Sequence, residues 1–249
     1  MKQTLVLSLL AALVLVGCSD SLTEVEPEAP GAVAGSSYSG TAEFEVAVRN
    51  ITTGQPFTPP LVATHNDHIR MFQVGAAASE GIKEIAENGN LGPLLDALNA
   101  SPNVSDVVVA VAGDPPPVMP GQTVKFNITT TPGNHYISFA SMLICTNDGF
   151  TGLDSRMLPS KVGDYVSFGL RGYDAGTEIN TEDFADIVPP CQGLVGISSD
   201  DEGTGMSNPA LAENSVIKHH PNVKGGDDLV PGVHGWRDPV AKVRVRRIR

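Results

Sequence analysis

Apolar and polar residues alternate along several stretches of the chain, which is the pattern of β-strands with one buried face. The first such stretch begins at residue 41 and places Phe44, Val46 and Val48 on one face. Further strands are expected at residues 107–111, 123–130, 136–144, 165–170 and 240–248. Because proline has no amide hydrogen to donate to a strand ladder, the proline-rich stretch 54–60 is expected to be a turn or loop.

Two segments after the first predicted strand repeat apolar residues at helical spacing instead. In the first segment this spacing is seen at Ala78, Ile82, Ile85 and Ala86. Ser79 precedes most of them as a candidate N-cap, and leucines at positions 91, 94, 95 and 98 continue the pattern in the second segment. Strands dominate elsewhere, and most stretches between them are too short for crossover helices. The pattern therefore predicts a mainly β fold, an antiparallel β-sandwich with a short helical insertion.

An apolar run from Leu5 to Val16, broken only by Ser8, comes before this domain and ends at Gly17 and Cys18. The run is shorter than the roughly 20 residues of a membrane-spanning helix, and polar residues follow it. We therefore expect residues 1–17 to be a secretion signal that ends in a lipobox and is cleaved, which leaves Cys18 as the lipidated residue.

The segment after Cys18 is rich in Glu, Pro, Ser, Ala and Gly and has little periodic apolar content. Residues 18–40 are therefore expected to be the lipidated cysteine and a flexible tether, followed by one domain over 41–249. The lipid would hold the protein at a bacterial cell envelope. An Asp directly after the lipidated cysteine favours the inner membrane, but Ser19 stands there, so the outer membrane is the expected location.

Charge narrows the range of partners. Removing residues 1–17 takes away only Lys2, so 16 − 1 = 15 basic residues face 28 acidic ones. A surface of this sign repels nucleic acid and favours divalent cations or basic partners. No nucleic-acid role is expected.

Two cysteines remain once Cys18 carries lipid, and an exported protein folds in an oxidising compartment. Cys145 and Cys191 can therefore form one disulfide. The alternative is a buried thiol at Cys145, which lies in an apolar run, with Cys191 free in a loop. The residues alone leave both arrangements open.

Acidic residues gather in two Gly-containing segments that follow predicted strands. Asp148 lies in Thr-Asn-Asp-Gly-Phe, and Asp174 and Glu178 flank an Ala-Gly-Thr turn. Calcium binds six to eight oxygens, usually from carboxylates and carbonyls on loops where glycine permits tight turns. The three carboxylates are candidate calcium ligands, although Asp, Asn and Gly are also the residues of ordinary turns.

The same segments resemble the spondin N-terminal domain family, which occurs in the matrix proteins F-spondin and mindin. The resemblance runs from about residue 41 to 249, and its most specific parts are Met-Leu-Ile-Cys-Thr-Asn-Asp-Gly-Phe at 142–150 and Tyr-Asp-Ala-Gly-Thr-Glu at 173–178. It extends to Gln-Pro-Phe-Thr-Pro-Pro at 55–60, Ala-Glu-Asn-Gly at 86–89 and Trp-Arg-Asp-Pro-Val-Ala-Lys-Val at 236–243.

This resemblance implies an extracellular β-sandwich adhesion module that binds calcium at one end and has no known catalysis. Asp148 matches the acid of the family's first motif, and Asp174 and Glu178 match the acidic pair of the second. The chain departs from the animal proteins F-spondin and mindin in having Thr-Asn-Asp-Gly in place of Ser-Pro-Asp-Trp, and Glu in place of Asp at position 178. The animal proteins' partners are therefore not transferred.

Other candidate sites have simpler interpretations. His65 and His68 are expected to be loop histidines, because a structural zinc site needs four ligands and nothing nearby supplies them. The C-terminal strand should point Lys242, Arg244 and Arg246 outward. This basic face could contact anionic lipid headgroups or lipopolysaccharide, or it could balance acidic neighbours and protect an edge strand.

Enzyme motifs are missing from the sequence: it has no Gly-x-Ser-x-Gly elbow, no His-Glu-x-x-His helix and no phosphate-binding glycine loop. We expect a non-enzymatic, calcium-binding envelope lipoprotein that presents an adhesion or binding surface to a protein or glycan partner. The alternative is a calcium-supported carbohydrate-binding or carbohydrate-active protein, in which Asp148 and Asp174 could be a glycosidase pair. Carboxylates that converge on one point would favour a cation, whereas two that face each other across an open groove would favour hydrolysis.

Overall fold

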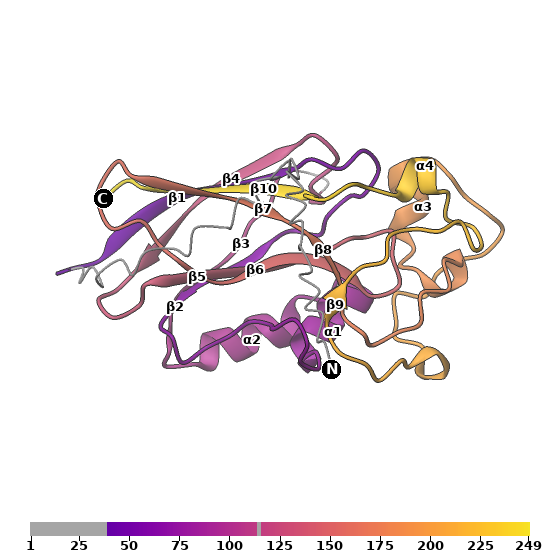
Figure 1. The fold of residues 1–249 in the computed structure, drawn as a ribbon, viewed down its shortest axis with the longest axis horizontal. Helices are drawn as coiled ribbons and strands as arrows, with labels where there is room; N and C mark the ends of the chain where they lie inside the picture. The colour runs from indigo at the N-terminus through magenta and orange to yellow at the C-terminus, as the bar shows by residue number, and fades with distance from the viewer. Residues whose placement is uncertain (1–38, 114–115) are drawn as a thin grey trace, which may run out of the picture. The chain divides into compact units, whose positions relative to one another are not determined.

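The computed structural model describes residues 39–113 and 116–249. The expected signal segment 1–17, the expected lipidation site Cys18 and nearly all of the expected tether 18–40 lie outside the described residues. Within the described part, the chain forms ten strands in two antiparallel sheets and four short helices. The predicted mainly β fold, an antiparallel sandwich with a short helical insertion, is confirmed (Figure 1).

One layer is a four-stranded sheet in the order β4-β1-β10-β7. Its strands are β4 Thr123–Thr130, β1 Ala42–Asn50, β10 Ala241–Arg247 and β7 Tyr165–Leu170. All four were expected from the sequence, and β10 alternates buried valines with exposed basic residues as predicted. Because β10 lies between β1 and β7, however, its basic face does not protect a sheet edge as the sequence suggested.

The other layer is a six-stranded sheet in the order β3-β2-β5-β6-β8-β9. Its strands are β3 Val104–Val109, β2 Leu61–His65, β5 Tyr136–Met142, β6 Gly149–Met157, β8 Gly172–Asp174 and β9 Lys218–His219. The sequence did not predict β2, β6, β8 or β9. Strand β2 is buried at all five positions, so it shows no alternation, and β6 begins inside a segment whose composition indicated a loop.

The two helices α1 Glu80–Asn88 and α2 Gly92–Ala100 follow β2, as the apolar spacing predicted. They lie on the side of the six-stranded sheet that faces away from the four-stranded sheet (Figure 1). Ser79 caps α1, because its side chain accepts a hydrogen bond from the backbone N–H of Ile82 at 3.3 Å. Gly89 ends the helix in the left-handed conformation at φ 65°.

Residues 175–240, called here the C-terminal loop region, connect β8 to β10 with little regular structure. Its short helical elements are η1 Phe184–Asp186, α3 Pro190–Val195, η2 Pro209–Leu211 and α4 Pro231–His234. A disulfide between Cys145 and Cys191, with Cα atoms 5.1 Å apart, joins this region to the turn between β5 and β6. Of the two arrangements left open by the sequence, the structure therefore contains the disulfide.

The core lies between the two sheets and continues under the helices. Its largest fully buried side chains include Phe44 of β1, Phe139 of β5 and Phe150 of β6. In the described residues, no helix is long and apolar enough to span a bilayer.

Candidate metal centre

Asp148 lies in the turn between β5 and β6 and is fully buried, at 0% exposure. Its Oδ2 accepts hydrogen bonds from the backbone N–H groups of Thr177 at 2.8 Å and Glu178 at 3.1 Å. Its Oδ1 is also buried, but it has no hydrogen-bond partner among the described residues. A buried carboxylate oxygen without a partner is costly unless some other group, such as a cation, satisfies it.

Asp174 comes to the same place from the end of β8, which pairs with the start of β6. Its Oδ1 accepts a hydrogen bond from the Gly176 N–H at 2.8 Å, and its Oδ2 accepts one from Asn180 Nδ2 at 2.9 Å. Gly176 has a φ of 71°, and a Cβ there would lie 2.6 Å from the Val216 carbonyl oxygen. The turn after Asp174 therefore requires glycine, which explains the Asp-Ala-Gly-Thr pattern.

Glu213, from the C-terminal loop region, is the third carboxylate of the group. Asp148, Asp174 and Glu213 each place a carboxylate oxygen within 4.8 Å of the others. The ammonium of Lys218 also reaches this group, with Nζ 2.6 Å from Glu213 Oε1 and 3.6 Å from Asp174 Oδ1. Lys218 thus supplies a positive charge where the carboxylates converge.

Glu178, the third ligand expected from the sequence, takes a different role in the structure. Its backbone N–H donates to Asp148, but its carboxylate points elsewhere, and Oε1 accepts a hydrogen bond from the Asn208 N–H at 2.8 Å. The backbone of Glu178 also forms an isolated bridge with Ala212. The structure therefore brings Asp148 and Asp174 together as predicted, and it places Glu213 rather than Glu178 beside them.

Burial makes ionisation of these carboxylates unfavourable. Burial and the nearby Asp174 charge raise the pKa of Asp148 to about 7, against the effect of its backbone hydrogen bonds. The pKa of Asp174 is also raised, mainly by burial. Burial raises the pKa of Glu178 to about 7 as well, assisted by the charges of Glu87, Asp148 and Asp186.

The donor set fits a hard divalent cation. The group offers carboxylate oxygens, which calcium and magnesium prefer, and Asp148 Oδ1 is the buried oxygen that a cation would satisfy. When bound, calcium would supply positive charge where the three carboxylates meet. Asp148, Asp174 and Glu213 are the residues that would hold it.

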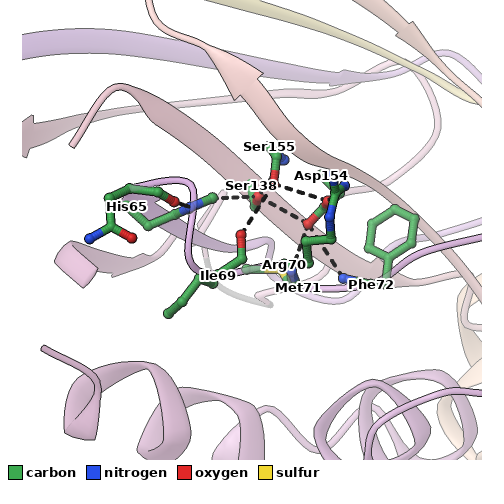
Figure 2. Close-up of polar contacts among 9 residues, drawn as sticks. His65, Ile69, Arg70, Met71, Phe72, Ser138, Asp154 and Ser155 are labelled. Atoms are coloured by element: carbon green, nitrogen blue, oxygen red, sulfur yellow. Dashed lines mark hydrogen bonds and ion pairs between the residues drawn. The ribbon is translucent and has the colours of Figure 1, made fainter. Parts of the chain in front are cut away.

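A second polar cluster joins β2, β5 and β6 (Figure 2). His65 is fully buried at the end of β2, not in a loop as expected, and its Nε2 lies 2.7 Å from Ser138 Oγ. Its Nδ1 lies 2.6 Å from the Asn66 carbonyl oxygen, so Nδ1 carries the proton and donates. The Asp154 carboxylate contacts Ser138 at 3.4 Å instead of His65. In a Ser-His-Asp triad the carboxylate contacts and orients the histidine. Here Ser138 lies between His65 and Asp154, so the three residues are not arranged as a triad.

Asp154 in this cluster anchors a neighbouring segment. Its Oδ1 accepts a hydrogen bond from the Met71 N–H at 2.6 Å, and its Oδ2 lies 3.1 Å from Arg70 Nη1 (Figure 2). The Ser155 hydroxyl donates to the same Oδ2 at 3.0 Å. The cluster therefore fixes residues 70–72 against β6. The spacing of the cluster's residues along the sequence did not predict this contact.

A comparison with known protein families identifies the domain. The Spondin_N family model matches residues 47–184, which is more than half of the 249-residue chain. The chain belongs to the Spondin_N family. The matched span includes Asp148, Asp174 and Glu178, whereas Glu213 and Lys218 lie beyond its end. No curated protein matches the chain.

Sequence reasoning missed Glu213 and Lys218 for an identifiable reason. Neither lies in a Gly-containing acidic turn or in a motif of the resemblance, and each is far from Asp148 along the chain. Only the folding of the C-terminal loop region brings them to β8, where Lys218 pairs with Asp174 in the ladder.

Proposed function

We propose that this spondin-family protein is a non-enzymatic, calcium-binding lipoprotein of the cell envelope that presents a binding surface. The observation that carries the proposal is the buried, unpartnered Oδ1 of Asp148 within a group of three carboxylates. Calcium bound there would connect the turn before β6, the end of β8 and the C-terminal loop region. Its role would be to order one end of the sandwich.

The arrangement of the carboxylates supports a cation site over a hydrolytic one. Asp148 and Asp174 are both 0% exposed, and they converge with Glu213 instead of facing each other across an open groove. A glycosidase needs its two carboxyl groups about 5 to 10 Å apart on either side of an accessible bond. Fully buried carboxylates do not offer that access.

The lipid anchor is the second part of the proposal and rests on the sequence. The apolar run that ends at Gly17 and Cys18 supports export and acylation of Cys18. We place the protein at the outer membrane, with residues 18–40 as the tether. The acidic charge balance disfavours nucleic acid, and the partner that we propose is a protein or a glycan.

Thermal melting with calcium against a chelator tests the metal site. Extracellular modules often bind calcium with Kd values of about 10⁻⁴ to 10⁻³ M. Calcium at tenfold above Kd adds RT ln 11, or about 1.4 kcal/mol, of stability. We expect Tm to rise by roughly 3 to 6 °C, and magnesium to substitute poorly because it demands a tighter octahedral shell.

Variants assign the ligands. Asp148→Asn and Glu213→Gln should remove most of the calcium-induced rise in Tm, and Glu178→Gln should keep it, because the carboxylate of Glu178 points to Asn208. The matched control is Asp164→Asn, which changes an exposed aspartate outside the group. A wild-type Tm that does not respond to calcium would remove the metal from the proposal.

Metabolic labelling with a fatty-acid analogue tests the anchor. The wild type should be labelled, whereas Cys18→Ala should remain unlabelled and be released from the membrane fraction. Equal labelling of both proteins would show that Cys18 is not the acylated residue. Protease treatment of intact cells would then report whether the domain lies on the outer surface.

A further inference from the structure

Two cavities lie beside β7, and basic side chains line both of them. The first, called here the arginine cavity, has a volume of about 640 Å³ and is lined by Arg70, Arg156 and Arg171. The second cavity has a volume of about 630 Å³ and is lined by Arg49, Lys242 and Arg244. Residues 167–169 of β7 line both cavities, but Lys242 and Arg244 belong to the exposed outer face of the four-stranded sheet, whereas Phe168 pairs with the buried Val243 and lies under the Arg156 guanidinium. The two cavities therefore lie on opposite faces of this edge strand. Each volume is in the range of small-molecule sites.

Basic side chains outnumber acidic ones in the lining of the arginine cavity. Asp154 is the one carboxylate that lines it, and this carboxylate pairs with Arg70. Arg156 and Arg171 are exposed and make no ion pair within the described residues. Such a concentration of positive charge is unexpected on a chain whose formal net charge is −12. The charge therefore favours an anionic ligand.

Aromatic rings form part of the wall beside these guanidinium groups. Tyr173 is stacked on His219 with ring centroids 5.6 Å apart, and the Phe72 ring lies 5.3 Å from Tyr173. The Arg156 guanidinium lies over the Phe168 ring at 6.0 Å. Aromatic rings beside guanidinium groups suit a ligand that has both an apolar face and anionic groups. The C–H face of a sugar ring is such an apolar face.

The wall of the cavity is held in place before any ligand binds. Asp154 fixes residues 70–72 through the Met71 N–H and the Arg70 guanidinium, and these residues carry Arg70 and Phe72 into the cavity wall (Figure 2). Tyr173 lies on β8, one residue before Asp174. Preorganised walls reduce the entropy lost on binding, which favours recognition of a specific ligand.

We propose that the arginine cavity binds an acidic carbohydrate chain. A sugar carboxylate pairs with Arg156 and Arg171, and a pyranose ring packs on Tyr173 and His219. Guanidinium groups match carboxylates in a bidentate geometry. The concave shape favours a chain that enters the cavity over a flat lipid surface. This inference rests on the proposed binding role and adds a ligand class to it.

The test is calorimetric titration of the purified full-length chain with two acidic hexasaccharides, one of hyaluronan and one of galacturonate. The neutral comparison is chitohexaose, which has the N-acetylglucosamine units of hyaluronan but no carboxylate. We expect the acidic probes to bind and chitohexaose not to bind. Arg156→Gln and Arg171→Gln should each weaken binding by roughly tenfold, because each removes a charge-assisted contact.

Lys161→Gln is the matched control, because it removes one positive charge from an exposed turn outside both cavities. Its affinity should stay within about twofold of the wild type. Arg171 is exposed, so unchanged thermal melting should show that its variant is folded. Equal losses in the control and the arginine variants would overturn the site, since overall charge would then account for the binding.

Two further measurements distinguish the sugar site from the calcium site and from a lipid-binding surface. The acidic hexasaccharides should still bind to the wild type in chelator and to Asp148→Asn. A failed calcium site and a failed sugar site therefore give different results. Vesicles with and without phosphatidylglycerol test a lipid surface. Absence of binding by both acidic hexasaccharides, or arginine-dependent binding of anionic vesicles alone, overturns the proposal.

Discussion

The sandwich and the C-terminal loop region satisfy their buried backbone groups in different ways. In the sandwich, continuous antiparallel ladders join β4, β1, β10 and β7, and alternating side chains fill the core. In residues 175–240 such ladders are short, and buried carboxylates accept some of the backbone N–H groups. Glu182, only 6% exposed, accepts hydrogen bonds from the N–H groups of Lys224, Gly225 and Gly226 at 2.5 to 2.7 Å.

This difference shows how an irregular region can be ordered without strands. It also shows that buried carboxylates in such a region require a positive charge nearby. Each carboxylate organises several N–H groups, as Asp148 does for Thr177 and Glu178. Buried negative charges then accumulate, and burial raises the pKa of Asp148 to about 7. A positive charge must offset them, and the structure supplies Lys218 while leaving Asp148 Oδ1 available to a cation.

The largest effect on this comparison should come from the disulfide that joins the two regions. Replacing Cys145 and Cys191 by alanine together should lower the free energy of unfolding by about 4 kcal/mol, because the disulfide closes a loop with a sequence separation of 46. Urea unfolding measures this loss. Hydrogen exchange should show that amides in residues 175–240 lose more protection than those of β1 and β10. Uniform loss of protection would contradict the division into two regions.

Removing the Glu182 carboxylate should have the next largest effect. Glu182→Gln replaces charge-assisted hydrogen bonds to three backbone N–H groups with weaker neutral ones. We expect a loss of about 2 to 3 kcal/mol by urea unfolding. The control Glu202→Gln changes an exposed glutamate of the same region and should stay within about 0.5 kcal/mol of the wild type. A small effect at Glu182 would mean that the carboxylate does not order this region.

A substitution of Lys218 tests whether its ammonium group and calcium offset the negative charge of the same carboxylates. Lys218→Met should lower the stability of the calcium-free protein and tighten calcium binding by roughly tenfold, which adds about 1.4 kcal/mol to the calcium effect. Melting with calcium and with chelator measures the difference. Lys224→Met, an exposed lysine, is the control. An unchanged calcium response in Lys218→Met would place the cation away from Asp174 and Glu213.

The smallest effect is expected in the helical insertion, where local sequence decides the structure. Ser79→Ala removes the hydrogen bond to the Ile82 N–H and should cost about 1 kcal/mol. Ser79→Thr should recover most of this loss because threonine is also a good N-cap. Thermal melting in chelator measures both variants. A dependence of the loss on calcium would show that α1 and the metal centre are coupled.

The local pattern of apolar residues was sufficient to predict a helix or a strand where the segment has one buried face. The spacing of Ile82 and Ile85 predicted α1, and the alternation of Phe44, Val46 and Val48 predicted β1. The same reasoning failed for β2, because a strand buried at every position shows no alternation. It also failed for β6, because its first residues are those of a turn.

The sequence by itself determined the sandwich, the family and two of the three converging carboxylates, because motif residues lie close together along the chain. Only the tertiary structure decided that Glu213 and Lys218 complete the group, and that the Glu178 carboxylate turns to Asn208. It also assembled the arginine cavity from residues on separate segments. These contacts join residues far apart in sequence, and their geometry depends on how the irregular region packs against β8.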